Sequence, residues 1–127
     1  MGAIQVSELV TDTKNKIMKL NVKERYAIRG VFLPKTASLL ESDLLDELID
    51  KVKITSSEMK KLDMKIDSNF ATWDVEKDEG IEVDIPDALL SLLQKSVKEA
   101  DKEGRIPYDP DDKTVRDLAK KILNYKV

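Results

Sequence analysis

The sequence predicts one mostly helical α+β domain, with three helices before an antiparallel β-hairpin and two helices after it. Two observations lead to this prediction. Apolar residues recur every three or four positions over most of the chain, as on one face of a helix, but every second position between 70 and 85, as in strands. The 127 residues also contain no repeat or low-complexity segment, and this length is typical of a single domain.

Three helix-start signals occur in the first half of the chain. Asn21, Ser38 and Thr55 are each followed three residues later by a glutamate, a spacing at which the two side chains cap free backbone N–H groups reciprocally. Helices are therefore expected over 22–32, 39–52 and 56–62. The second of these has one apolar stripe, formed by Leu40, Leu44, Leu45, Leu48 and Val52.

The period of the pattern changes to two after residue 70. Alternate apolar residues share one side of each of two short segments: Ala71, Trp73 and Val75, then Ile81, Val83 and Ile85. A polar run that ends in Gly80 separates the segments. Two strands around such a turn predict an antiparallel β-hairpin.

Two helices are expected after the hairpin. Pro86 suits the first turn of the earlier one and Gly104 its end. Its apolar stripe is formed by Leu89, Leu90, Leu93, Val97 and Ala100. The last helix begins near Asp111 or Asp112 and has a packed face, formed by Val115, Leu118, Ala119 and Ile122.

The first 17 residues are expected to form an N-terminal arm or extension, and residues 18–127 the single α+β domain. Ile4 and Val6, with the apolar residues that follow them, fit a short strand or a short helix. This arm is therefore a candidate for self-association into a homo-oligomer.

The aromatic residues are few, and most are expected in the core. Trp73 has apolar neighbours on its side of the expected hairpin, which favours packing against the helices; a protein interface is the alternative. Tyr26, Phe32 and Phe70 are expected in the core or at its edge. Tyr108 lies in a turn between two prolines and is expected to be exposed, as a second candidate for a protein interface.

Several kinds of chemistry are excluded by composition. The chain has no cysteine and no histidine, so it has no disulfide, no zinc site built on those residues and no catalytic triad that needs an imidazole. Its apolar runs are far shorter than the roughly 20 residues that span a bilayer. A cytoplasmic protein with no cofactor and no membrane contact is the expectation.

The chain resembles small proteins of tailed phages and prophages from about Met18 onward. The similar segments are MKLNVKERYAIRGVFLPK at 18–35, ITSSEMKKLDM at 54–64 and EVDIPDALLSLLQKSVKEADKEGRIP at 82–107. Their shared features are structural: a helix opened by Val-x-Glu-Arg and ended by proline, and a strand that leads into an amphipathic helix. The resemblance implies a phage or prophage origin, and it implies no activity or functional residue.

No catalytic or metal-binding constellation stands out among the acidic residues. Asp74, Glu76 and Asp78 have the spacing of the first calcium ligands of an EF-hand, but Glu79 and Ile85 stand where that loop needs glycine and glutamate. The acids of the second helix lie opposite its leucine stripe and are expected to face solvent. A metal-dependent hydrolase built on carboxylates is the least favoured class, and the chain is expected not to be an enzyme.

Charge is unevenly distributed along the chain. Residues 14–29 contain six bases and one acid, whereas residues 74–87 contain seven acids and one base. Three helices followed by a hairpin are also the order of a winged helix-turn-helix, whose third helix would place lysines near DNA phosphates. The candidate nucleic-acid contacts are Lys60, Lys61, Lys65, Lys23, Arg25 and Arg29. The acidic hairpin and the net charge of −3 oppose this alternative.

The favoured function is therefore noncatalytic. The chain is expected to be a small adaptor, regulatory or accessory protein of phage origin that acts through protein–protein contacts. A winged-helix-like nucleic-acid-binding regulator is the alternative. Trp73, Tyr108, Ile4 and Val6 are the candidate protein-interface residues.

Overall fold

The computed structural model describes residues 15–68 and 70–126. Its elements in chain order are β1 (Asn15–Leu20), α2 (Val22–Ala27), a π-helical turn (Ile28–Phe32), α3 (Leu39–Val52), α4 (Ser56–Lys61), β2 (Lys65–Ile66), β3 (Ala71–Thr72), a 3₁₀ turn (Val75–Lys77), β4 (Ile81–Pro86), α5 (Asp87–Lys102) and α6 (Thr114–Asn124). The α+β class is confirmed.

The helix-start signals act as the sequence predicts. Asn21 and Thr55 form complete capping boxes with Glu24 and Glu58. Ser38 accepts a hydrogen bond from the backbone N–H of Glu41 at 3.2 Å. All three helical segments therefore begin where a polar side chain satisfies backbone donors that the first turn leaves free.

The expected hairpin is wrong, although both of its segments contain extended residues. β4 pairs antiparallel with β1, and Met18 lies opposite Val83. β3 pairs instead with β2. Alternation of apolar residues indicates which face of a strand is buried, but it does not indicate which strand lies beside it. The apolar residues of β4 lie on the same face of the sheet as those of β1.

Strand β1 crosses the domain boundary that we expected between residues 17 and 18. It begins at Asn15, and its inward residues Met18 and Leu20 are fully buried. The folded domain therefore includes residues before Met18. Ile4 and Val6 lie outside the described residues.

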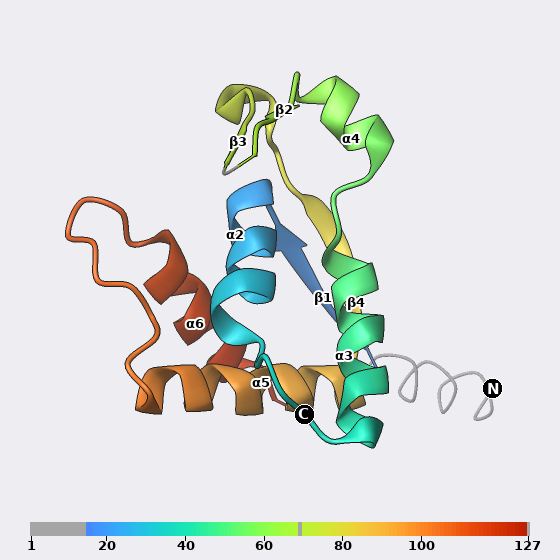
Figure 1. Cartoon of the computed structure of the whole chain (residues 1–127), viewed down its shortest axis with the longest axis vertical. Coiled ribbons are helices and arrows are strands. Elements are labelled where there is room, and N and C mark those ends of the chain that lie inside the picture. Colours follow the sequence, from blue (N-terminus) through green and yellow to red (C-terminus); the bar gives the residue numbers. More distant parts are fainter. Residues whose placement is uncertain (1–14, 69, 127) are drawn as a thin grey trace, which may run out of the picture.

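The core lies between the β1–β4 sheet and the helices. Val83 and Ile85 of β4 face it, together with Met18 and Leu20, and α5 supplies more of the remaining core residues than any other helix. Leu40 is an exception to the predicted stripe of α3, because 74% of its surface is exposed. It belongs to the first turn of α3, which projects beyond α5 at the lower end of the molecule in Figure 1.

Gly80 is needed where the chain enters β4. Its φ is +81°, and a Cβ at this position would lie 3.2 Å from the backbone carbon and oxygen of Leu20. Any other residue here would adopt an unfavourable backbone angle, and its Cβ would press against the rigid backbone of Leu20. The glycine of the polar run thus allows β4 to begin close beside the end of β1.

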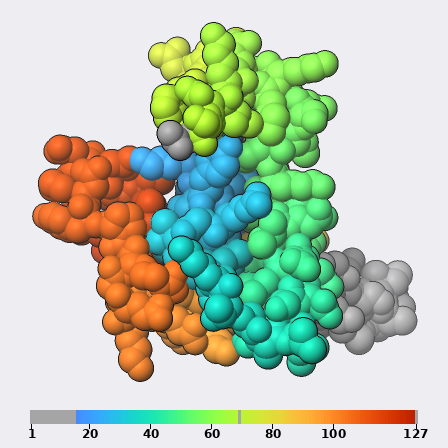
Figure 2. Space-filling model, in the orientation of Figure 1, coloured from blue at the N-terminus to red at the C-terminus, as the bar shows by residue number. Residues whose placement is uncertain are grey.

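A small lobe lies at one end of the molecule, and we define it as residues 54–68 and 70–80. It contains α4, β2, β3 and the 3₁₀ turn, at the top of Figure 1. The β1–β4 sheet, α2 with the π-helical turn, and the longer helices α3, α5 and α6 form the rest of the molecule, which we call the body. Figure 2 shows the lobe projecting from the body along the long axis.

Candidate interaction surface

A buried ion pair fastens the small lobe to the body. The Arg25 guanidinium on α2 donates to both carboxylate oxygens of Glu58 on α4, at 3.0 Å and 2.6 Å. The Arg25 side chain is only 1% exposed. Arg25 is thus a structural contact between lobe and body, and its predicted role as a nucleic-acid contact is not compatible with its burial.

The pKa of Glu58 is held below its ordinary value of 4.5. The main cause is the hydrogen bonding from Arg25, and bonds from Thr55 act in the same direction. Burial opposes them, because a carboxylate loses hydration there. The folded state therefore favours the charged form of Glu58.

This shift predicts that lowering the pH reduces the free energy of unfolding, in part because Glu58 becomes protonated. A pKa that is lower in the folded state contributes stability that is present above the unfolded pKa and is lost as pH falls through the folded value. Urea unfolding of the wild type and of Glu58→Gln should therefore differ most near pH 7, and the difference should shrink below pH 4.5. A difference that stays constant down to pH 3 would contradict this assignment.

Aromatic residues form a second contact between lobe and body. The rings of Tyr26 on α2 and Trp73 lie 6.0 Å apart at an angle of 48°, and the Tyr26 hydroxyl lies 4.0 Å from the sulfur of Met64. Trp73 is half-buried, and its Nε1 is buried without a hydrogen-bond partner among the described residues. Trp73 thus packs against a helix, as we expected, but against α2 beside the lobe.

The lobe exposes several large apolar side chains. Ile66 and Phe70 are each 63% exposed, and Val75 is 71% exposed. The expectation that Phe70 lies in or beside the core is therefore wrong. Sequence alternation also placed Val75 in a strand, but it opens a 3₁₀ turn and faces solvent. No sequence signal singled out Ile66 as a surface residue.

The lobe also exposes basic side chains. Lys60 and Lys61 of α4 and Lys65 of β2 are exposed, and none of them forms an ion pair with another residue of the described ranges. Lys65 pairs with Thr72 across β2 and β3. Because side chains alternate along strands, Phe70 and the exposed Asp67 lie on the Lys65 side of this ribbon, and Ile66 lies on the other side.

The other predicted basic contacts do not extend this surface. Lys23 forms an ion pair with Asp112, which precedes α6. Arg29 is exposed in the π-helical turn that follows α2, on the body. The structure therefore groups Lys60, Lys61 and Lys65 on the lobe and leaves Lys23 and Arg29 on the body.

Tyr108 is exposed as expected, but it belongs to a different part of the surface. It lies in the loop between α5 and α6, where 76% of its surface is exposed and the Arg116 guanidinium lies 5.3 Å from its ring centre. In Figure 1 this loop projects from the side of the body, away from the lobe. Tyr108 and Trp73 therefore do not form one interface.

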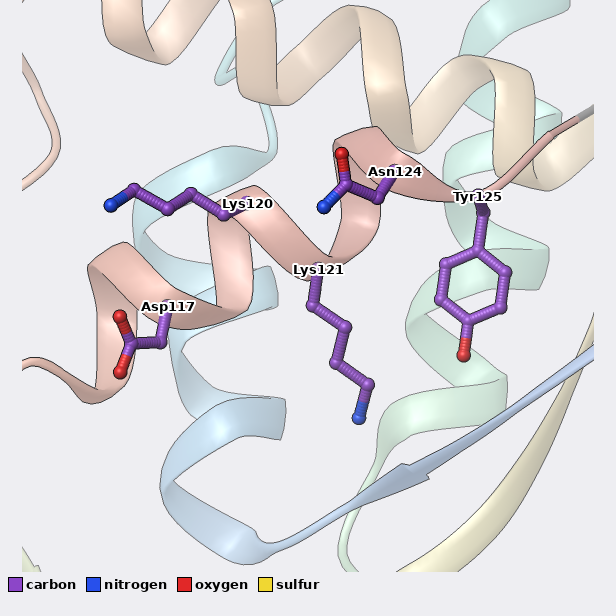
Figure 3. Close-up of a pocket in the computed structure, with 5 residues that line it drawn as sticks. All are labelled: Asp117, Lys120, Lys121, Asn124 and Tyr125. Atoms are coloured by element: carbon purple, nitrogen blue, oxygen red, sulfur yellow. The ribbon is translucent and has the colours of Figure 1, made fainter.

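A shallow hollow of about 520 Å³ lies on the described surface and is lined by Asp117, Lys120, Lys121, Asn124 and Tyr125. Figure 3 shows Lys121 and Tyr125 pointing toward β1. They donate to the backbone carbonyls of Lys19 and Ile17, at 3.1 Å and 3.3 Å. These side chains cover part of a free strand edge, which would otherwise invite pairing with another strand.

The carboxylates with EF-hand spacing have local structural partners. Asp74 accepts from the backbone of Glu76 at 3.1 Å, and Asp78 accepts from the backbone of Val22 at 2.9 Å. Within residues 15–68 and 70–126, no three acidic side chains are grouped so that they would hold a metal ion. The Asp78 bond is a further link between the lobe and the start of α2.

Comparisons of the chain with protein-family models, with curated proteins and with solved structures find no match. In the part of the chain that the structure describes, no helix is both long and apolar enough to cross a membrane. The exposed surface of the small lobe is therefore the feature from which we infer function.

Proposed function

We propose that this chain is a noncatalytic binding protein that acts by holding another protein molecule against its small lobe. The observation that carries this proposal is the exposure of Ile66, Phe70 and Val75 on one small lobe. Several large apolar side chains left in water on one small lobe are typical of a protein interface. Aromatic residues in interfaces often contribute most of the binding energy.

The construction of the lobe supports the same proposal. The Arg25–Glu58 pair and the Tyr26–Trp73 contact hold the lobe against α2. A surface that is already ordered loses little conformational entropy when a partner binds. The lobe can therefore present Phe70 in a fixed position.

The test is affinity capture from nuclease-treated extract of the source cells. We expect the wild type to retain a protein that Ile66→Asp combined with Phe70→Asp loses by roughly tenfold or more, because both changes place a charge in the contact. Tyr108→Asp is the matched control, since it also replaces an exposed ring with a carboxylate, and it should retain the protein. Circular dichroism verifies that all three proteins are folded.

Two results would contradict the proposal. If the wild type and the lobe variant capture the same amount of protein, the interface lies outside the lobe. Captured proteins that disappear with nuclease would instead favour the nucleic-acid-binding alternative, in which Lys60, Lys61 and Lys65 contact phosphates. The wing of that alternative is not formed by 70–75 and 81–85, because these segments pair with other strands.

A further inference from the structure

A second hollow lies between α5 and α6, on the body. It has a volume of about 290 Å³, which is near the lower limit for a small-molecule site. Its apolar lining comes from both helices and from the loop between them: Val97, Ile106, Ala119 and Leu123. In Figure 1 α5 lies at the lower end of the molecule and the lobe at the upper end, so this hollow is separate from the proposed protein interface.

Three charged side chains complete the lining of this hollow. They are Asp101 of α5 and Arg116 and Lys120 of α6. Within 15–68 and 70–126, none of the three has an ion-pair partner. The Arg116 guanidinium lies 5.3 Å from the ring centre of Tyr108, and its Nε is buried without a hydrogen-bond acceptor among the described residues. A buried donor of this kind costs stability, so a ligand that supplies an acceptor would be favoured.

Two of these charges lie at helix ends that carry the same sign. Asp101 is in the last turn of α5, where the helix dipole is negative, and Arg116 is in the first turn of α6, where the dipole is positive. The neighbouring charges of opposite sign, Lys102 and Asp117, do not line this hollow. The α5 side of the hollow therefore favours a cationic group, and the start of α6 favours an anionic one.

From these features we infer that the hollow between α5 and α6 binds a free amino acid with an apolar side chain. Such a molecule carries an anionic and a cationic group close together, beside an apolar group of small volume. Its carboxylate accepts from Arg116, its ammonium group faces Asp101, and its side chain contacts the apolar lining. Arginine pairs strongly with carboxylates because both groups are planar and charged. This inference goes beyond the proposed function and does not depend on it.

The test is a nuclear magnetic resonance titration of the purified, nitrogen-15-labelled full-length chain with L-valine, L-leucine and L-phenylalanine, each added separately. At least one should cause saturable shifts of backbone amide signals in 97–106 and 116–123. N-acetyl and carboxamide derivatives of that amino acid remove one charge each, and each should bind roughly tenfold more weakly or worse, because a charged hydrogen bond is lost. Glycine, which lacks the apolar group, should also bind more weakly.

Arg116→Gln should weaken binding of the same amino acid by roughly tenfold or more, because a neutral amide replaces the charged donor. Arg29→Gln is the matched control, since Arg29 is an exposed arginine on the body that does not line the hollow, and it should bind as the wild type does. The inference would be overturned if none of the three amino acids caused saturable shifts, or if the shifts lay outside the hollow. Equal binding by the N-acetyl or carboxamide derivative, or by Arg116→Gln, would also overturn it.

Discussion

Replacing Glu58 with alanine should lower the free energy of unfolding by about 3–5 kcal/mol, because the Arg25 guanidinium then stays buried without a counter-ion. Arg25 is 1% exposed, and its bonds to Glu58 are short and bidentate. The change also removes the glutamate of a capping box. Urea unfolding at pH 7 measures the loss, and hydrogen exchange should show the largest loss of protection in the lobe.

Two comparisons separate the buried charge from other effects of this change. Glu41→Ala removes a glutamate at the same helix position, whose ion pair with Lys95 is exposed, so it should cost much less stability than Glu58→Ala. Arg25→Met combined with Glu58→Met removes both charges and should recover most of the lost stability. Equal losses for Glu58→Ala and Glu41→Ala would contradict the role of the buried pair.

Replacing Phe32 with alanine should lower the free energy of unfolding by about 3–5 kcal/mol, because a fully buried ring is removed from the core. Phe32 ends the π-helical turn after α2 and belongs to the central cluster of the body. A domain of this size is typically stable by about 5–15 kcal/mol, so the variant should unfold at a much lower urea concentration. Hydrogen exchange should rise throughout the body.

Phe70→Ala is the matched control, because the chain has two phenylalanines and only one of them is buried. It should change the free energy of unfolding by about 0.5 kcal/mol or less, as surface substitutions usually do. The two variants separate a role in stability from a role in binding. A loss of stability for Phe70→Ala as large as that for Phe32→Ala would place Phe70 in the core and remove the basis of the proposed interface.

Local signals in the sequence predicted where α2, α3 and α4 begin. The three capping residues and the apolar stripes depend on contacts a few residues apart, so the bounds of α3 agree with the prediction. Strand pairing failed because it depends on distant residues. Strand β4 needed an apolar partner face, and that face belongs to Met18 and Leu20, more than sixty positions earlier.

The candidate site was predicted only in part. The exposed lysines of the lobe follow from charge patterning, but the exposure of Phe70 and Ile66 does not, because Phe70 opens a segment with the period of a strand and no pattern marks Ile66. Arg25 shows the opposite error. A basic residue was expected at the surface, and its burial depends on Glu58, which lies 33 positions away and supplies the counter-charge.

The most direct measurement is site-specific crosslinking in the source cells with a photoreactive phenylalanine analogue at Phe70. The account predicts a discrete crosslinked protein, which mass spectrometry identifies, and no such product from the same analogue at Tyr108. A product that contains two copies of this chain would identify a second copy as the protein that the lobe binds. Crosslinks from position 70 to nucleic acid alone, or none, would contradict the claim that the lobe binds protein.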